Sequence, residues 1–118
     1  MKKKVVIGGC RDDTDYVFFR SRIDEIPRDK TDEIIILSGH CSGVDLMGER
    51  YAMENGFQIE LFLPEWKKYG RAAGPIRNKK MVECADIVIA FWDGVSKGTG
   101  SLIKCAQNNK KEVIKIDI

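Results

Sequence analysis

Glycine-rich segments that could hold a phosphate follow three apolar stretches of the chain. These segments are Gly8–Arg11, Ser38–Asp45 and Asp93–Gly100. Because glycine has no Cβ, it lets backbone N–H groups approach a ligand closely. A helix that begins directly after such a loop adds unpaired N–H groups and a partial positive charge. The three segments therefore predict a site for an anion, with phosphate as the natural candidate.

Side chains in and near these loops extend the candidate site. Hydroxyl groups at Ser42, Ser96 and Thr99 could donate hydrogen bonds, and basic side chains could supply charge. Neither the G-x-G-x-x-G fingerprint nor the P-loop pattern is present, which argues against ATP hydrolysis by the P-loop route. The candidate ligand-binding residues are Gly9, Cys10, Arg11, Ser38, Gly39, His40, Ser42, Gly43, Asp45, Arg77, Asn78, Asp93, Gly94, Ser96, Lys97, Gly98 and Thr99.

Three charged residues are candidates for catalysis, and each has an ordinary structural alternative. Asp45 could instead cap the helix that follows it, and Glu49 could be a solvated helix residue. Arg77 falls near an expected helix start, where a positive charge is unfavourable. This position favours a functional role, in which Arg77 pairs with phosphate or with one of the two carboxylates. His40 could act on a ligand or be a polar loop residue.

The four cysteines, at positions 10, 41, 84 and 105, form no C-x-x-C pair, and we expect free thiols. Cys84 and Cys105 fall on expected helices and are interpreted as small core residues. Cys10, Cys41 and His40 fall on expected loops, but they make an incomplete ligand set with no zinc-like spacing. No metal site is predicted.

Two aromatic residues, Trp66 and Tyr69, fall in an expected loop together with Lys67, Lys68 and Gly70. They could stack on a base or cover the site as a lid. They could equally pack against the rest of the domain.

Five apolar stretches alternate with segments of helical periodicity, which predicts crossover connections and a parallel sheet. The first, second and fourth stretches are continuously apolar, as in strands covered on both faces, whereas the third and fifth include polar residues that suit sheet edges. The strand order 3-2-1-4-5 puts the three apolar strands in the middle and is reachable with right-handed crossovers. It creates a ligand crevice between the first and fourth strands. The expected strands are Lys4–Gly8, Glu33–Leu37, Gln58–Leu63, Asp86–Trp92 and Glu112–Ile116.

Four helices are expected between these strands, each from residues at helical spacing. The first ends at Pro27 and the second near Gly56, and Pro75 is tolerated in the first turn of the third. The residues expected on one face are Tyr16, Phe19, Ile23 and Ile26 in the first helix, Val44, Met47, Gly48, Tyr51 and Ala52 in the second, Arg77, Met81 and Cys84 in the third, and Leu102, Cys105 and Ala106 in the fourth.

The length and composition fit one α/β domain. The 118 residues suit a single Rossmann-like, three-layer domain over 1–118. The net charge of +2 gives no argument for nucleic acid, which is therefore not an expected partner. No stretch approaches the roughly 20 apolar residues needed to span a bilayer. Since Val5–Ile7 runs directly into two glycines, there is no signal-peptide core, and we expect a cytoplasmic location.

Several motifs of the chain form a combination that is specific for one family. These motifs are Gly70–Asn78 followed by Met81 and Ala85-Asp86, Leu37–Gly39, Ser42–Asp45, and Phe91–Gly94 followed by Ser96–Thr99. Together they resemble the YspA-like branch of the SLOG superfamily, a Rossmann-like domain of unknown function. The resemblance extends over essentially the whole chain and implies a nucleotide or nucleotide-derived ligand.

The enzymes of this superfamily are the LOG phosphoribohydrolases, whose pattern the chain matches only in part. Arg77 with Met81 is similar to their Arg-Lys-x-x-Met helix, and Gly98-Thr99 to the centre of their Gly-Gly-x-Gly-Thr-x-x-Glu loop. The Glu of that loop is replaced by Leu102, and Trp92–Gly94 replaces the proline and paired glycines before it. An oxocarbenium-like transition state needs nearby carboxylates, which Leu102 cannot supply.

Three functions follow from these observations. The first is binding or sensing of a nucleotide-type phosphate ligand. The second is hydrolysis of a nucleotide at its N-glycosidic bond, with Asp45, Glu49 or Asp93 supplying the carboxylate. The third is a homo-oligomeric interaction module, and the LOG relationship makes a homodimer the natural form. No cofactor is expected beyond the nucleotide-type ligand itself.

Overall fold

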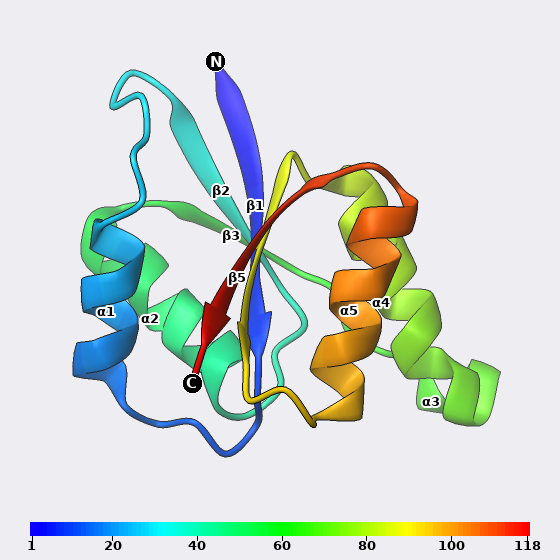
Figure 1. Ribbon diagram of the computed structural model, residues 1–118. Helices are drawn as coiled ribbons and strands as arrows, with labels where there is room; N and C mark the ends of the chain where they lie inside the picture. The colour runs from blue at the N-terminus through cyan, green and yellow to red at the C-terminus, as the bar shows by residue number, and fades with distance from the viewer.

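Five parallel strands form the middle layer of the structure, a computed structural model of residues 1–118. Helices α1 and α2 cover one face of this sheet, and α4 and α5 cover the other (Figure 1). In chain order the elements are β1 (Lys2–Gly9), α1 (Tyr16–Asp24), β2 (Glu33–Ser38), α2 (Val44–Asn55), β3 (Gln58–Leu61), α3 (Trp66–Tyr69), the 3-10 helix η1 (Gly70–Ala72), α4 (Ala73–Cys84), β4 (Ile87–Trp92), α5 (Lys97–Asn108) and β5 (Glu112–Asp117).

The strand order is β3-β2-β1-β4-β5, which confirms the predicted order and the Rossmann-like α/β class. The central strand β1 pairs in parallel with both neighbours, so that Val5 lies opposite Ile36 of β2 and Ile87 of β4. The chain winds outward from β1 through α1 to β2 and through α2 to β3, and the crossover through α4 then returns to β4 on the other side of β1. The carboxyl ends of β1 and β4 flank the resulting switch point, where open α/β sheets bind ligands.

Alternating residues of the central strands fill two separate cores. On the α1 and α2 face, Phe19 stacks on Phe91 with ring centroids 4.9 Å apart. On the α4 and α5 face, Val6 and Val88 pack with Met81 and Leu102. Because the central strands bury both faces, they carry continuous apolar runs, as expected from the sequence.

The helix boundaries follow from local signals. The Asp15 side chain caps α1 by accepting a hydrogen bond from the N–H of Phe18 (3.1 Å). Gly56 ends α2 in the left-handed conformation, with φ of 70°. Pro75 lies in the first turn of α4, where its missing N–H is not needed.

Four details differ from the sequence predictions. Helix α1 ends at Asp24 and not at Pro27, so Ile26 lies beyond it. The segment with Trp66 forms the short helix α3 and then η1, where a loop is expected. Strand β3 ends at Leu61 because Pro64, which lacks an N–H, follows soon after. Cys84 is exposed at the last position of α4, since Val82 takes the inward position in that turn.

No helix of the structure is both long enough and apolar enough to cross a lipid bilayer.

Candidate functional site

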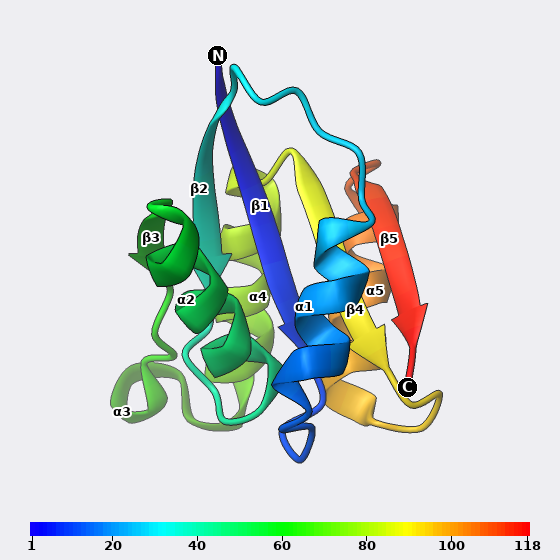
Figure 2. The ribbon, with the colours of Figure 1, turned by 90° about the vertical axis from the view of Figure 1, so that its left-hand side faces the viewer.

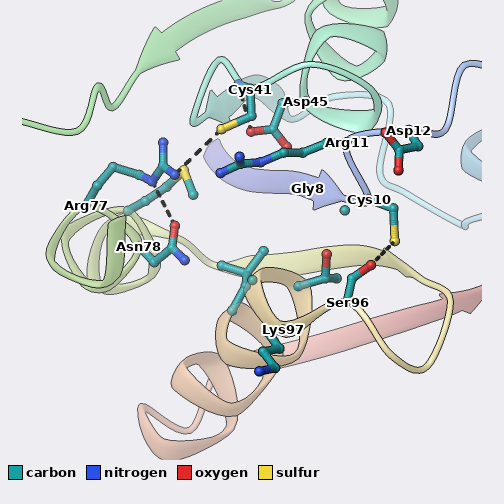
Figure 3. Close-up of a pocket in the computed structure, with 15 residues that line it drawn as sticks. Gly8, Cys10, Arg11, Asp12, Cys41, Asp45, Arg77, Asn78, Ser96 and Lys97 are labelled. Carbon is teal, nitrogen blue, oxygen red and sulfur yellow. Dashed lines mark hydrogen bonds between the residues drawn. The ribbon is translucent and has the colours of Figure 1, made fainter. Parts of the chain in front are cut away.

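A pocket of about 390 Å³ lies at the carboxyl ends of β1 and β4, at the switch point of the sheet. Residues from four regions meet there: the end of β1 with the loop after it, the loop after β2 with the first turn of α2, helix α4, and the first turns of α5 (Figure 3). Its lining residues are Gly8, Gly9, Cys10, Arg11, Asp12, Cys41, Asp45, Arg77, Asn78, Met81, Ser96, Lys97, Gly98, Thr99 and Leu102.

Arg77 forms one wall of the pocket and is only 9% exposed. Its Nη1 donates to the carbonyl oxygens of Gly39 (2.8 Å) and Phe62 (3.3 Å), and its Nε donates to the side chain of Asn78 (2.8 Å). The remaining nitrogen, Nη2, lies 3.8 Å from the sulfur of Cys41. The guanidinium thus ties α4 to the ends of β2 and β3, and keeps one lightly engaged N–H group beside the pocket.

Asp45 lies on the same wall and is 8% exposed. Burial raises the pKa of this carboxyl to about 6, although the N–H groups of Cys41 and Gly9 and the charge of Arg77 act in the opposite direction. The bond from the Cys41 N–H to Oδ2 is 3.2 Å long. Asp45 therefore combines a buried position with a titration near neutral pH, the range suited to proton transfer.

Two glycines allow this wall to pack tightly. A Cβ on Gly39 would lie 2.6 Å from Nη1 of Arg77 and 3.0 Å from Oδ2 of Asp45. Gly43 has φ of 79°, and a Cβ there would collide with the carbonyl oxygens of Cys10 and Arg11. These glycines serve close packing of the first two loops, so neither lines the pocket.

The opposite wall is the N-terminus of α5, and it has unused hydrogen-bond donors. The first backbone bond of the helix runs from Gly100 N–H to Ser96 O (3.0 Å), and the N–H groups of Lys97, Gly98 and Thr99 have no partner. The Thr99 side chain is 5% exposed, and its hydroxyl makes no hydrogen bond. This combination is typical of an anion site at a helix N-terminus.

Asp93 shapes the loop that precedes this helix. Its Oδ1 accepts hydrogen bonds from the N–H groups of Val95 (2.9 Å) and Ser96 (2.8 Å), and its Oδ2 accepts one from the Ser96 hydroxyl (2.8 Å). These bonds lower the pKa of Asp93 to about 2. The Cys10 thiol donates to the same Ser96 hydroxyl (3.3 Å), which links the first loop to the third. Asp93 is thus a support for the loop, and it does not line the pocket.

Arg11 supplies a second cation. It is exposed, and its side chain extends across the pocket toward the side that carries Arg77 and Cys41 (Figure 3).

Ser38, His40 and Glu49 form a separate cluster beside the pocket. Glu49 accepts hydrogen bonds from the hydroxyl of the fully buried Ser38 (2.7 Å) and pairs with Nδ1 of His40 (2.8 Å). The Ser38 hydroxyl also accepts the N–H of His40, whose φ is 60°. The cluster holds the loop after β2 in an uncommon conformation, and none of its members lines the pocket.

The structure therefore divides the candidate residues into two groups. Those that meet in the pocket are Gly9, Cys10, Arg11, Asp45, Arg77, Asn78, Ser96, Lys97, Gly98 and Thr99. Those that lie outside it are Ser38, Gly39, His40, Ser42, Gly43, Glu49, Asp93 and Gly94.

The pocket also contains residues absent from the candidate set. They are Gly8, Asp12, Cys41, Met81 and Leu102. Met81 could have been found because it follows Arg77 by one helical turn, and Leu102 because it follows Thr99 by three residues. No group of three or more His, Cys, Asp or Glu side chains is arranged to hold a metal ion.

Comparison with known proteins gives the family. Residues 3–69 match the family described as YspA, cpYpsA-related SLOG family. The chain belongs to this SLOG family. Membership indicates a function related to nucleotides in general terms. The match ends at Tyr69, so Arg77 and the α5 loop join the site on the basis of the structure.

A curated relative is also similar to this SLOG protein. Over 80 aligned residues the chain is 34% identical to the Gene 61 protein of Mycobacterium phage D29. The aligned region covers 63% of this chain and 64% of that protein. The chain therefore spans slightly less than two thirds of the length of that relative. No solved structure matches the chain.

Proposed function

We propose that the pocket binds a nucleotide or nucleotide-derived ligand, with a phosphate group at the N-terminus of α5. The observation that carries the proposal is the set of unpaired donors at one point: the N–H groups of Lys97, Gly98 and Thr99 and the free hydroxyl of Thr99. The first N–H groups of a helix have no intrahelical partner, and here they lie beside a pocket that can hold an anion to accept from them. An anion there also gains from the helix dipole.

The remaining part of the pocket suits the rest of such a ligand. A volume of about 390 Å³ falls in the range of small-molecule sites. Arg11 and the Nη2 group of Arg77 offer further positive charge, and Asp45 offers a carboxylate that accepts hydrogen bonds from hydroxyl groups. These groups favour a ligand that combines an anionic end with a hydroxyl-bearing one, as nucleotides do.

Hydrolysis of an N-glycosidic bond is a second candidate, favoured by the position of Asp45. A Cβ on Gly8 would lie 2.9 Å from a Leu102 methyl group and 3.5 Å from Oδ1 of Asp45, so both side chains lie over the same glycine. Leu102 occupies the place of the Glu in the LOG pattern. Asp45 brings a carboxyl group close to that place, with a pKa of about 6. It could therefore replace the missing acid.

Thermal shift and product analysis separate the two functions. The protein is incubated with inorganic phosphate, adenosine monophosphate, ADP-ribose and NAD. We expect phosphate-bearing ligands to raise Tm, and adenosine without phosphate to have no effect. Stabilisation without product supports binding alone, whereas release of free base that is lost in Asp45→Asn supports hydrolysis.

Thr99→Val is the matched variant for the binding site, because it keeps the shape of the side chain and removes only the hydroxyl. We expect a smaller Tm increase with each phosphate ligand at an unchanged Tm of the free protein. An equal ligand-induced rise in Tm in both proteins would contradict a phosphate at this point. A rise in Tm caused by adenosine, which has no phosphate, would contradict it as well.

A further inference from the structure

Positive charge is concentrated in one segment of the chain, Trp66–Val82. This segment contains six of the 20 Lys and Arg residues and none of the 18 Asp and Glu residues. The rest of the chain therefore has 14 basic residues against 18 acidic ones. The small net charge hides a basic segment attached to an acidic remainder.

The structure gathers this segment at one corner of the molecule. Helix α3, η1 and the start of α4 project there, at the end opposite the N-terminus (Figures 1 and 2). No residue of α3 is buried. Five of the six cations are exposed, namely Lys67, Lys68, Arg71, Lys79 and Lys80, while Arg77 is buried.

Two aromatic side chains lie among these cations. Trp66 is 54% exposed, and the edge of its ring passes close to Gly74 in the first turn of α4. The Tyr69 ring has the Lys68 ammonium 5.1 Å and the Lys80 ammonium 6.0 Å from its centroid. Trp66 begins α3, and its exposed indole next to Lys67 and Lys68 leaves both apolar and charged groups without a covering partner.

A cleft of about 230 Å³ adjoins the Tyr69 ring. Tyr69 and Lys80 line it together with the apolar side chains of Leu61, Leu63 and Ile76. Glu65 and Arg77 also line it, so its lining carries two cations and one carboxylate around an apolar centre. The apolar part of the cleft suits a flat group such as a base, and the exposed cations along α3 and η1 suit the negative charge of the same partner.

We propose that this corner binds single-stranded nucleic acid, with bases against Trp66 and Tyr69 and phosphates at the surrounding lysines and Arg71. Sites for single strands combine aromatic rings, on which bases stack, with cations that follow the backbone. An acidic polypeptide would use the same cations, but it offers no flat group for the exposed indole and the cleft. Arg77 is the only residue that lines both this cleft and the phosphate pocket, so the two sites are otherwise separate.

Fluorescence anisotropy with labelled dT15 and U15 tests the proposal on the full chain. We expect binding that weakens steeply with salt, because phosphate contacts release counterions. The double variant Lys67→Glu with Lys68→Glu is expected to lower the affinity at least tenfold. Its matched control is Lys2→Glu with Lys30→Glu, which makes the same charge change at exposed positions in β1 and in the loop between α1 and β2, and is expected to stay within twofold.

Tryptophan fluorescence reports stacking of a base on the indole, which charge attraction by itself does not produce. The chain has two tryptophans, so in a Trp92→Phe background the signal comes from Trp66. We expect quenching of this signal by dT15, and a fivefold or greater loss of affinity in Trp66→Ala.

Three outcomes overturn the proposal. Competition by polyglutamate as effective as that by dT15 identifies a site for acidic polypeptides. Duplex DNA that binds as tightly as the single strand, without quenching, removes the role of the aromatic rings. An equal loss of affinity in the matched control shows attraction to overall charge and no site.

Discussion

The two walls of the pocket differ in how completely their polar groups are satisfied. On the wall formed by α4 and the loop after β2, Arg77 and Asp45 are buried, and their side chains are hydrogen-bonded to backbone groups of other segments. On the wall formed by α5, the N–H groups of Lys97, Gly98 and Thr99 have no partner. The first wall is built to hold the chain together, and the second has donors to give to a ligand.

This difference teaches which substitutions should affect stability and which should affect binding. Buried groups that satisfy each other cost free energy when one partner is removed. Deleting a donor that has no partner should leave the free energy of unfolding unchanged, because no hydrogen bond within the protein is lost. Substitutions on the two walls test this division.

Gly43→Ala should give the largest loss of stability. The residue has φ of 79°, and its Cβ would collide with the backbone of the first loop. We expect the free energy of unfolding to fall by about 4 kcal/mol, from backbone strain and overpacking together. Urea denaturation measures it.

The control is Gly98→Ala on the other wall, where nothing lies within 4 Å of the added Cβ. It should be neutral or stabilising by up to about 1 kcal/mol, since alanine suits a helix better. Equal losses in the two variants contradict the division between the walls.

Arg77→Met should lower the free energy of unfolding by about 3 kcal/mol. It keeps an unbranched apolar chain but leaves the carbonyl oxygens of Gly39 and Phe62 without their donor, and Asp45 without a nearby cation. Lys97→Met, on the exposed start of α5, should change stability by less than about 0.5 kcal/mol. Denaturation curves of the two variants at pH 7 provide the comparison.

Asp45→Asn should stabilise the protein at neutral pH. Because the pKa of the folded state is raised from 3.8 to about 6, the folded protein binds this proton more tightly than the unfolded chain does. The contribution of Asp45 to stability therefore falls as pH rises from about 4 to about 6, and stays constant above. The shift corresponds to about 3 kcal/mol in full, of which we expect Asn to recover about 2 kcal/mol at pH 7.

The measurement is the free energy of unfolding of both proteins between pH 3.5 and pH 7.5. The difference should be small at the acidic end and grow through pH 6. A difference that is independent of pH would show that Asp45 does not titrate in this range.

Thr99→Val should have the smallest effect on the free protein, within about 0.5 kcal/mol, because its hydroxyl makes no hydrogen bond. Its effect should appear in binding, as a fivefold to tenfold weaker Kd for adenosine monophosphate, which corresponds to about 1 kcal/mol for one hydrogen bond. Isothermal titration calorimetry measures it. A loss of stability with no change in Kd would place the hydroxyl in the fold and outside the binding site.

The sequence predicts the strand order because hydrophobic pattern and strand position are linked by burial. Continuous runs such as Ile34–Leu37 can lie only between two covered faces, whereas the polar residues of β3 and β5 fit the edges. It does not predict α3, whose four residues bury no side chain and so show no periodic pattern.

The site is predicted less completely, because glycine-rich loops that look alike contain residues with two different roles. Gly98 and Gly43 look alike in the sequence, yet the first lies in the pocket and the second in a close backbone contact. Similarly, the Asp93 carboxylate accepts its hydrogen bonds from its own loop, whereas the Arg11 side chain extends into the pocket. Only the contacts of each group in the folded structure distinguish residues that support a loop from residues that line the pocket.

The central claim is that phosphate binds at the free N–H groups of α5. Titration of ¹⁵N-labelled protein with inorganic phosphate, followed by amide chemical shifts, tests it most directly. The largest shifts should occur at Lys97, Gly98 and Thr99, with small ones at Gly39 and Cys41, whose surroundings are already bonded. Unchanged amides at the start of α5, with shifts confined to other cations such as the Lys2–Lys4 run, would contradict the claim.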